Sequence, residues 1–177
     1  GPGATNLITG IAAAHMDSVP TVFITGQVSR DAIGKDAFQE TDVTGVTLPI
    51  TKHNYLVMSA SEIAESIHEA FYLASTGRPG PVLLDIPKDV FLEEAEFAYP
   101  ETIDLPSYKP TEQPDPSLVA QAAQLIDKAQ TPLILAGHGI IISRAYDELM
   151  RLSERAQIPV VTTLLGISSF PETHPLS

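Results

Sequence analysis

The chain contains no cysteine. This absence excludes disulfide bonds, thiolate catalysis and cysteine-based zinc sites among its 177 residues. A chain without cysteine is compatible with a reducing cytoplasm, which is the compartment that we expect. The five histidines show no metal-ligand spacing, and no G-x-S-x-G pattern marks a serine nucleophile, so we expect no metal site and no Ser-His-Asp triad in this sequence.

Basic residues are also scarce. Ten lysines and arginines stand against 22 aspartates and glutamates, which gives a formal net charge of −12 at pH 7. An acidic chain repels phosphate backbones, so we expect no nucleic-acid partner. Long apolar runs are missing as well, because none approaches the roughly 20 residues that span a bilayer. We therefore expect no membrane association, and the opening residues do not show the pattern of a secretion signal.

Helix and short strand alternate through the first half of the chain. The apolar periodicity predicts helices over 5–17 and 59–76, and strands over 21–24, 53–58 and 81–86. Ser59 and Glu62 have the spacing of a capping box, and Gly77 is a C-terminal stop. The predicted buried face of the second helix consists of Ile63, Ile67, Ala70, Phe71 and Ala74. This alternation is typical of an α/β fold built around a parallel sheet.

Two stretches break this pattern. Residues 27–39 are polar and contain glycine, and a loop of that length inside a compact domain is often functional. Residues 93–115 contain recurrent prolines, which prevent a regular helix or a central strand. We interpret this second stretch as an interdomain linker.

A second α/β unit follows the linker. Asp115 is suited to cap a helix that begins at Pro116, with an apolar face formed by Leu118, Ala122, Leu125, Ile126 and Ala129. Strands are predicted over 132–136 and 159–162, with Gly137-His138-Gly139 as a turn between strand and helix. Ser143 is expected to cap the helix that precedes the second strand.

The most distinctive stretch of the chain is Ile33-Gly34-Lys35-Asp36-Ala37-Phe38-Gln39-Glu40-Thr41-Asp42. Six shorter segments accompany it: GPGATN at 1–6, DSVP at 17–20, ITGQV at 24–28, TKHN at 51–54, GRPGPV at 77–82 and DIPKDV at 85–90. Together they resemble the family of acetolactate synthase large catalytic subunits, which are thiamine-diphosphate enzymes. The GPG and GRPGPV segments occur across related thiamine-diphosphate enzymes, whereas the long loop is more specific to this branch.

The resemblance implies a three-domain parent protein. Residues 1–92 would be the later part of its pyrimidine-binding domain, 93–115 a linker, and 116–177 the start of a Rossmann-like, FAD-associated middle domain. The sequence is then a fragment. The catalytic glutamate of the family is expected upstream, and the motif that holds Mg²⁺ and the diphosphate is expected downstream. We therefore expect no catalytic residue and no metal ligand within this chain, and no activity from the chain alone.

The resemblance also implies the activity of the parent. That enzyme condenses two pyruvates, or pyruvate and 2-oxobutyrate, to 2-acetolactate or 2-aceto-2-hydroxybutyrate with loss of CO₂, in branched-chain amino-acid synthesis. Its cofactors are thiamine diphosphate, Mg²⁺ and FAD, the last in a structural role. Active sites form between two subunits, so a homodimer or higher assembly is expected, and a small regulatory subunit is a further possible partner.

Five residues of the first half would lie at the active site by this resemblance. Pro2 and Asn6 would lie near the aminopyrimidine of thiamine diphosphate, where bare amides at a helix start suit a polar ligand. Phe38 and Gln39 would line the active site, with Gln39 close to the cofactor. Lys88, just after a predicted strand, would lie at the mouth of the substrate channel.

A second set of residues would contact FAD. Arg78 has a planar fork that suits a phosphate or a flavin edge. The other members of the set are Gly137, His138, Gly139, Thr163, Leu164 and Gly166. Two positions depart from the usual pattern of the family: His138 stands where a small residue is usual, and Ser29 where many members have proline.

The residues leave three alternative interpretations of the chain open. The parent could be another thiamine-diphosphate carboligase or decarboxylase, such as glyoxylate carboligase. The chain could be a stable fragment without activity. The Gly137-His138-Gly139 turn could belong to an NAD-dependent dehydrogenase, although Ile142 stands where a third glycine is expected.

Overall fold

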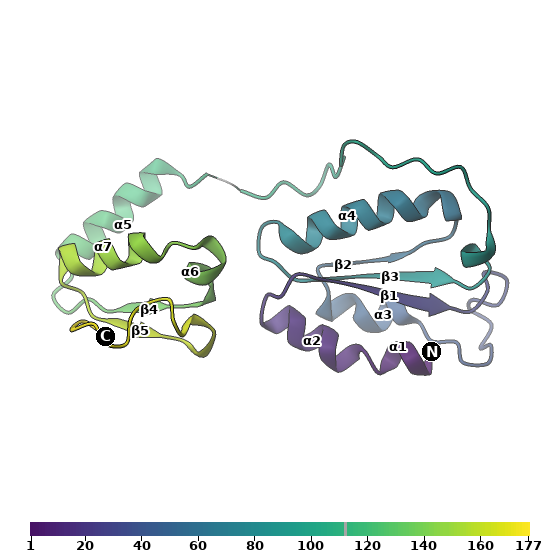
Figure 1. Ribbon diagram of the computed structural model, residues 1–177, viewed down its shortest axis with the longest axis horizontal. Helices are drawn as coiled ribbons and strands as arrows, with labels where there is room; N and C mark the ends of the chain where they lie inside the picture. The colour runs from purple at the N-terminus through teal and green to yellow at the C-terminus, as the bar shows by residue number, and fades with distance from the viewer. Residues whose placement is uncertain (112) are drawn as a thin grey trace. The chain divides into compact units, whose positions relative to one another are not determined.

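The chain forms two compact units, Gly1–Glu112 and Gln113–Ser177. The structure is a computed structural model that describes residues 1–111 and 113–177. Each unit contains its own parallel sheet and its own helices (Figure 1). In the part of the chain that the structure describes, no helix is long and apolar enough to cross a membrane.

A three-stranded parallel sheet organises the first unit. Strand β3 (Pro81–Pro87) lies in the middle, between β1 (Thr21–Gln27) and β2 (His53–Leu56). Thr21 pairs with Pro81 and His53 with Val82, so all three strands run in the same direction. Every residue of β3 is buried, which explains its continuous apolar run. The predicted parallel α/β fold is confirmed.

Helices cover both faces of this sheet (Figure 1). On one face, α4 (Ile63–Ser75) contributes Ala70 and Ala74 to a core that contains Leu84 of β3. On the other face, Ile11 of α2 and Val43 of α3 pack with Leu83. The elements of this second face are α1 (Pro2–Thr5), α2 (Ile8–Met16), α3 (Val43–Thr47) and the 3₁₀ turn η1 (Leu48–Ile50). Successive strand residues thus anchor opposite helix layers.

The start of α4 differs from the predicted capping box. The first turn is the 3₁₀ helix η2 (Ala60–Glu62), and the Oγ of Ser59 accepts the N–H of Ser61 at 3.3 Å. The Glu62 carboxylate reaches back to the N–H of Met58 at 3.1 Å. Both hydrogen bonds are therefore shifted by one residue from the predicted pairs, because a 3₁₀ turn is tighter than an α-helical one.

The buried face of α4 is also shifted from the predicted one. Phe71 is 62% exposed, and Leu73 is buried in its place. Ala70 and Ala74 are buried as predicted. Helix α4 ends at Ser75 with Thr76 as its C-cap, and Gly77 follows directly with φ +57°, a left-handed conformation that glycine adopts without strain, so the predicted C-terminal stop is confirmed.

The chain after β3 stays on the first unit for some distance. A short 3₁₀ turn, η3 (Val90–Leu92), is followed by an extended segment. The Tyr99 ring lies 4.8 Å from that of His68, and Tyr108 packs against the α4 core. The amine of Lys52 donates to the hydroxyl of Tyr108 at 3.2 Å. Part of the stretch that the sequence predicts as a linker therefore packs on unit 1, and the domain boundaries stay a prediction.

The second unit is built around two parallel strands, β4 (Ile134–Ala136) and β5 (Val160–Thr162). Ala136, Leu149, Val160 and Phe170 form its core. Its remaining elements are α5 (Pro116–Lys128), α6 (His138–Ser143), α7 (Tyr146–Ala156) and the 3₁₀ turn η4 (Leu164–Gly166). Asp115 caps α5 by accepting the N–H of Ser117 at 2.8 Å, as predicted.

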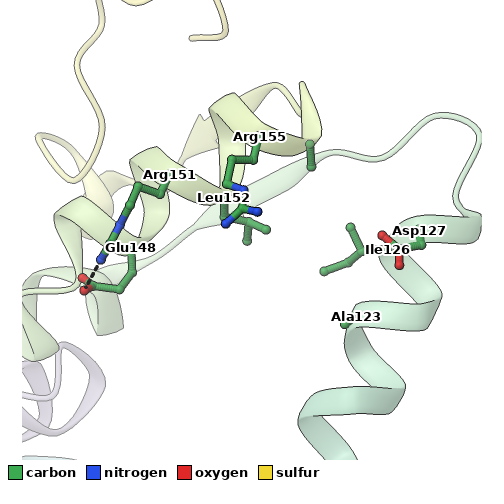
Figure 2. Close-up of a pocket in the computed structure, with 8 residues that line it drawn as sticks. Ala123, Ile126, Asp127, Glu148, Arg151, Leu152 and Arg155 are labelled. Atoms are coloured by element: carbon green, nitrogen blue, oxygen red, sulfur yellow. Dashed lines mark hydrogen bonds and ion pairs between the residues drawn. The ribbon is translucent and has the colours of Figure 1, made fainter.

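Helix α5 is amphipathic but does not bury its apolar face. All of its residues are described and none is fully buried; Leu125 is 72% exposed. A cleft of about 540 Å³ separates its Ala123 and Ile126 from Leu152 of α7 (Figure 2). The sequence predicted the face of this helix, but the face lacks a partner among the described residues of unit 2.

The loop after β4 also differs from the prediction. Gly137-His138-Gly139 is not a free turn, because Gly137 caps α6 and the helix begins at His138. Ser143 lies at the end of α6, where its hydroxyl donates to the carbonyl O of Gly139 at 2.7 Å. The N-cap of α7 is Ala145, so the predicted capping role of Ser143 is wrong. The hydroxyl bonds back to the preceding turn instead of starting a new helix.

Truncation in the centre of unit 1 tests this layering. Leu84→Ala removes a fully buried side chain and should lower the free energy of unfolding by about 2–5 kcal/mol. Phe71→Ala, on the exposed side of α4, should change it by about 0.5 kcal/mol or less. Urea unfolding followed by circular dichroism measures both, and equal losses would contradict the observed layers.

Candidate functional site

The carboxyl ends of β1, β2 and β3 meet at one edge of the first sheet, because the strands are parallel. The long loop over residues 28–42 follows β1 at this edge, and Lys88 follows β3. Helix α1 and the first residues lie beside the end of β1 (Figure 1). The residues that the sequence assigned to thiamine diphosphate and its substrate therefore come from segments around this edge.

A hollow of about 420 Å³ opens beside the end of β1. Its lining includes Gly1, Pro2, Gly26 and Gln39. Gly26 presents no side chain, and a Cβ placed there would meet no atom within 4 Å. Gly1 is different, because a Cβ there would collide with the carbonyl O of Gln39. The glycine lets the start of the chain lie directly against the loop that carries Gln39.

Gln39 itself has a left-handed backbone, with φ +61°. For a residue with a side chain this conformation is uncommon and is held by the surrounding structure. The structure brings Gln39 together with Pro2 in the hollow, as the prediction of a shared cofactor site requires. Asn6 is exposed just beyond α1, and Phe38 is 88% exposed.

A buried carboxylate ties the long loop to the sheet. Asp85 of β3 is fully buried, and its Oδ1 accepts the hydroxyl of Thr25 at 2.7 Å. Its Oδ2 accepts the side-chain amide of Gln27 at 2.8 Å. The same amide donates to the carbonyl O of Thr41 at 2.7 Å, and the Gln27 Oε1 accepts the N–H of Val28 at 2.9 Å. Gln27 thus holds both ends of the loop.

Burial raises the pKa of Asp85 above its ordinary value, and the hydrogen bonds from Thr25 and Gln27 oppose that shift in part. The charge of the N-terminal amine also opposes the shift, and the charge of Asp42 adds to it. The protonation of Asp85 is therefore coupled to the hydrogen bonds through which Gln27 holds the two ends of the loop.

Glu40 folds the middle of the loop back on itself. Its carboxylate accepts the N–H groups of Gly34 and, at 2.8 Å, of Ala37. These backbone hydrogen bonds, with that of Gly34 the largest, lower the pKa of Glu40. Gly34 has φ +76°, which places its N–H at the carboxylate without strain. The loop is thus shaped by its own acidic residue just before it reaches α3.

Lys88 lies at the same edge of the sheet. Its side chain is exposed, and its backbone N–H donates to the carbonyl O of Gln27 at 3.0 Å. This bond continues the pairing of β1 and β3 by one residue beyond the strands. The segment that carries Lys88 is therefore fixed directly to the start of the loop that carries Gln39.

Arg78 lies at the other edge of the sheet, before the start of β3. Its Nε donates to the hydroxyl of Ser18 at 2.8 Å, and its Nη2 contacts the carbonyl O of Met16 at 3.4 Å. The structure thus separates this predicted FAD contact from the hollow at Gln39. The two predicted cofactor sites use opposite ends of the same sheet.

The predicted FAD residues of the second unit gather at the carboxyl edge of β4 and β5. The N–H of Thr163 donates to the carbonyl O of Ala136 at 2.9 Å. A Cβ at Gly166 would collide with that same carbonyl, so glycine is required for the close approach. Gly137, the N-cap of α6, lies beside Thr163. His138 and Gly139 lie in the first turn of α6, and Leu164 is exposed in η4.

The sequence analysis did not identify the polar residues that hold this site together. Asp85 carries a signal that could have been used, because it is the only charged residue in the buried run 81–87. Thr25 and Gln27 carry no such signal, since polar residues at a strand end are common. Among the described residues, no group of three acidic or histidine side chains is arranged to hold a metal ion.

Comparison with protein families agrees with this arrangement. The family described as thiamine pyrophosphate enzyme, N-terminal TPP binding domain, matches residues 1–46. The family described as thiamine pyrophosphate enzyme, central domain, matches residues 119–177. One match falls in each structural unit, and the second speaks against the dehydrogenase interpretation of the Gly137 segment.

Similar proteins match over nearly the whole chain. The acetolactate synthase large subunit of Corynebacterium glutamicum is 52% identical over 99% of the chain. The acetolactate synthase of Arthrospira platensis is 53% identical, and the probable acetolactate synthase large subunit of Methanocaldococcus jannaschii 51% identical, each over 100% of the chain. The chain spans only 28%, 31% and 30% of the length of these relatives, respectively.

The buried carboxylate predicts a pH dependence. Because the folded pKa of Asp85 is raised, the native state binds the proton more tightly than the unfolded state. The contribution of Asp85 to the free energy of unfolding should therefore fall as the pH rises from about 4 through the folded pKa.

Asp85→Asn keeps the shape and removes the titration. Urea titrations across the pH range measure the free energy of unfolding of both proteins. The value for the native chain minus the value for this variant should decrease as the pH rises. Asp147→Asn, at an exposed position on α7, is the matched control. A difference for Asp85→Asn that does not vary with pH would contradict the assignment.

Proposed function

Since this chain belongs to the acetolactate synthase large-subunit branch of the thiamine pyrophosphate enzymes, we propose that it is part of an enzyme that forms 2-acetolactate from pyruvate. The observation that carries this proposal is the 52% identity with one such subunit over 99% of the chain. The names of the other relatives also favour acetolactate synthase over glyoxylate carboligase. In the parent enzyme, pyruvate or 2-oxobutyrate is the second substrate, and CO₂ is released.

The hollow at the end of β1 suits part of a cofactor. Thiamine diphosphate, when bound, supplies the carbanion chemistry that removes CO₂ from a 2-keto acid. In this proposal Pro2, Asn6 and Gln39 hold its aminopyrimidine. Bare Gly26 leaves the hollow open, and the Gln39 amide offers both a donor and an acceptor to a heterocycle. The fit supports the proposal for Pro2 and Gln39, which line the hollow, while Asn6 belongs to it by family membership.

The substrate would approach from the exposed side of the same edge. We assign Lys88 and Phe38 to the substrate channel, because both are exposed and both lie in segments that follow the carboxyl ends of parallel strands. The ammonium group of Lys88 would attract the carboxylate of a 2-keto acid. The Phe38 ring would supply apolar contact when it is covered by substrate or by another part of the protein.

FAD and Mg²⁺ belong to the proposal by family membership. Arg78 of unit 1 and Gly137, His138, Gly139, Thr163, Leu164 and Gly166 of unit 2 are the proposed FAD contacts. A Cβ at Gly139 would meet no atom within 4 Å, and one at Gly137 only the Thr163 hydroxyl at 3.8 Å, so the start of α6 leaves room for a ligand at the backbone, which supports this assignment. The proposed Mg²⁺ ligands lie in the parts of the relatives that this chain does not span.

The remaining features of the proposal concern the assembly. We propose a homodimer or higher oligomer, with active sites shared between subunits, and a small regulatory subunit as a further partner. The parent would act in branched-chain amino-acid synthesis in the cytoplasm. Lack of cysteine fits that compartment.

A graft tests the function. This chain replaces the aligned 176 residues of the Corynebacterium glutamicum large subunit. We expect the graft to form acetolactate from pyruvate, thiamine diphosphate and Mg²⁺, with kcat/KM within about tenfold of that subunit. Gln39→Ala should lower kcat/KM by a further factor of about 100, because it removes a contact to the cofactor. Gln130→Ala, an exposed glutamine in unit 2, is the control.

Two outcomes would count against the proposal. A graft that folds and binds thiamine diphosphate but forms no acetolactate would assign the chain to a different reaction. Acetolactate formed by the 177-residue chain alone would show that the rest of the relatives' length is not needed for activity. We expect no product from the chain alone, because it spans 28% of that relative.

A further inference from the structure

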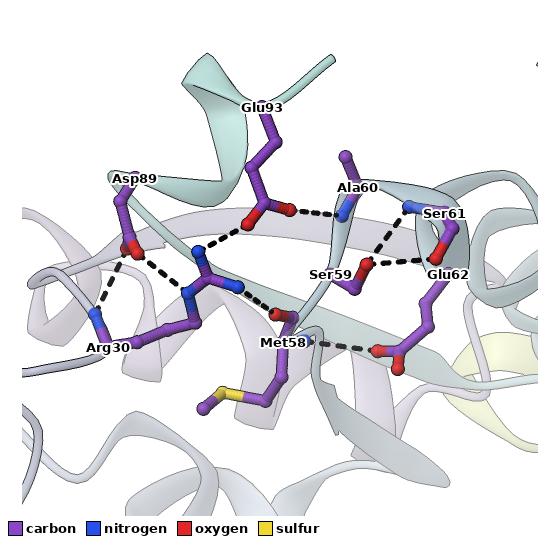
Figure 3. A network of polar contacts seen from close by, with 8 residues as sticks. All are labelled: Arg30, Met58, Ser59, Ala60, Ser61, Glu62, Asp89 and Glu93. Carbon is purple, nitrogen blue, oxygen red and sulfur yellow. Dashed lines mark hydrogen bonds and ion pairs between the residues drawn. The ribbon is translucent and has the colours of Figure 1, made fainter. Parts of the chain in front are cut away.

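One guanidinium joins the segments that follow all three strands of unit 1. Arg30 lies after β1, Met58 after β2 and Asp89 after β3 (Figure 3). The Nη1 of Arg30 donates to the carbonyl O of Met58 at 2.9 Å, and its Nε donates to Oδ2 of Asp89 at 2.6 Å. Its Nη2 pairs with the carboxylate of Glu93. Each nitrogen of the side chain thus holds a different acceptor.

Both carboxylates use their second oxygen as well. Oδ1 of Asp89 accepts the backbone N–H of Arg30 at 3.0 Å, so this aspartate grips the residue at two points. Oε2 of Glu93 accepts the N–H of Ala60 at 2.9 Å, at the start of η2 (Figure 3). The network therefore extends from the long loop to the start of the helix that covers the sheet.

The hydrogen bonds of this network favour the ionised form of both carboxylates. The Arg30 side chain lowers the pKa of Asp89, and the N–H of Ala60 is the largest cause that lowers the pKa of Glu93. Both groups are therefore ionised at neutral pH. About a third of each side chain is exposed, at 34% for Arg30 and 35% for Asp89. An isolated ion pair with this exposure contributes little to the free energy of unfolding. A planar guanidinium with several partners can nevertheless fix the relative positions of the segments that carry those partners.

The network holds the two segments that carry the proposed substrate and cofactor contacts. Lys88 is the neighbour of Asp89 in sequence, and its N–H is bound to the carbonyl O of Gln27. Arg30 lies three residues after Gln27, in the loop that carries Gln39. A movement of Asp89 relative to Arg30 would therefore change the position of Lys88 relative to Gln39.

We propose that Arg30 is a positioning residue, which with Asp89 and Glu93 fixes Lys88 against the Gln39 loop so that a 2-keto acid is bound in one orientation. The proposal rests on the function proposed above. It assigns to Arg30 no contact with substrate. Arginine suits this role better than lysine, because lysine, a point charge with three donors, cannot hold three acceptors in one plane.

The active graft described above provides the kinetic test. Arg30→Met and Asp89→Asn should each raise KM for pyruvate about tenfold, which corresponds to the loss of one charged hydrogen bond. The kcat of each variant should stay within about twofold of that of the unmodified graft. The double variant should resemble either single variant, because both remove the same coupling. Arg30→Lys should restore part of the affinity. Arg151→Met, which removes a more exposed pair with Glu148 on α7, should leave KM unchanged.

The kinetic results separate positioning from stability. Unchanged KM for pyruvate in both Arg30→Met and Asp89→Asn would overturn the proposal. Activity lost in proportion to a fall in melting temperature would overturn it too, since that is the result of a structural role. If Arg30→Met does not fold, Asp89→Asn and Glu93→Gln, which keep the size of each side chain, carry the same test.

Hydrogen exchange in the 177-residue chain tests the network independently of activity. Amides of residues 31–40 and of Lys88 should exchange about tenfold faster in Asp89→Asn than in the native chain, and those of α7 at the same rate. Equal exchange in the loop would overturn the proposal. A graft that forms no acetolactate would defeat the proposed function alone, because the exchange result would still decide whether Arg30 fixes the two segments.

Discussion

Burial of β3 on both faces is the constraint on which unit 1 depends. All seven of its residues are buried, so each face of the strand must be covered by helices. Leu83 faces the layer of α2 and α3, and Leu84 faces α4. Because β1 and β2 both pair with this strand in parallel, the ends of all three strands reach the same edge. The fold of the core therefore determines where a ligand can meet the polypeptide.

Polar groups at this edge are arranged by depth. Asp85 lies deepest, where its carboxylate organises Thr25 and Gln27 and so fixes the neck of the long loop. Arg30 and its acidic partners lie nearer the surface and tie the same loop to the segment after β3. The loop is thus held by two acidic residues four positions apart in sequence. Between them lies Lys88, whose backbone is fixed while its side chain remains exposed.

Unit 2 follows the same principle on a smaller scale. Its two parallel strands bring Gly137 and Gly166 to one edge, where absent side chains allow close backbone approach. The amphipathic pattern of α5 correctly predicted a helix, but the apolar residues of that helix remain exposed. Periodicity reports which residues share a face and not what covers that face. The same limit applies to α4, where Leu73 is buried and the predicted Phe71 is not.

The sequence by itself determined the order of the longer helices and the strands, the parallel class of the sheet and, by resemblance, the family, whereas the short helices α3 and α6 were not predicted. These follow from local periodicity, from glycine and proline positions such as Gly77, and from motifs that are continuous in sequence. Only the tertiary structure brought Gln39 against Gly1, or Arg30 into contact with Met58, Asp89 and Glu93. Those contacts join residues up to 63 positions apart in the printed sequence, and side-chain hydrogen bonds across such separations leave no periodic trace. They exist because parallel strands with separate connections end at one edge, which is a property of the sheet and not of any segment.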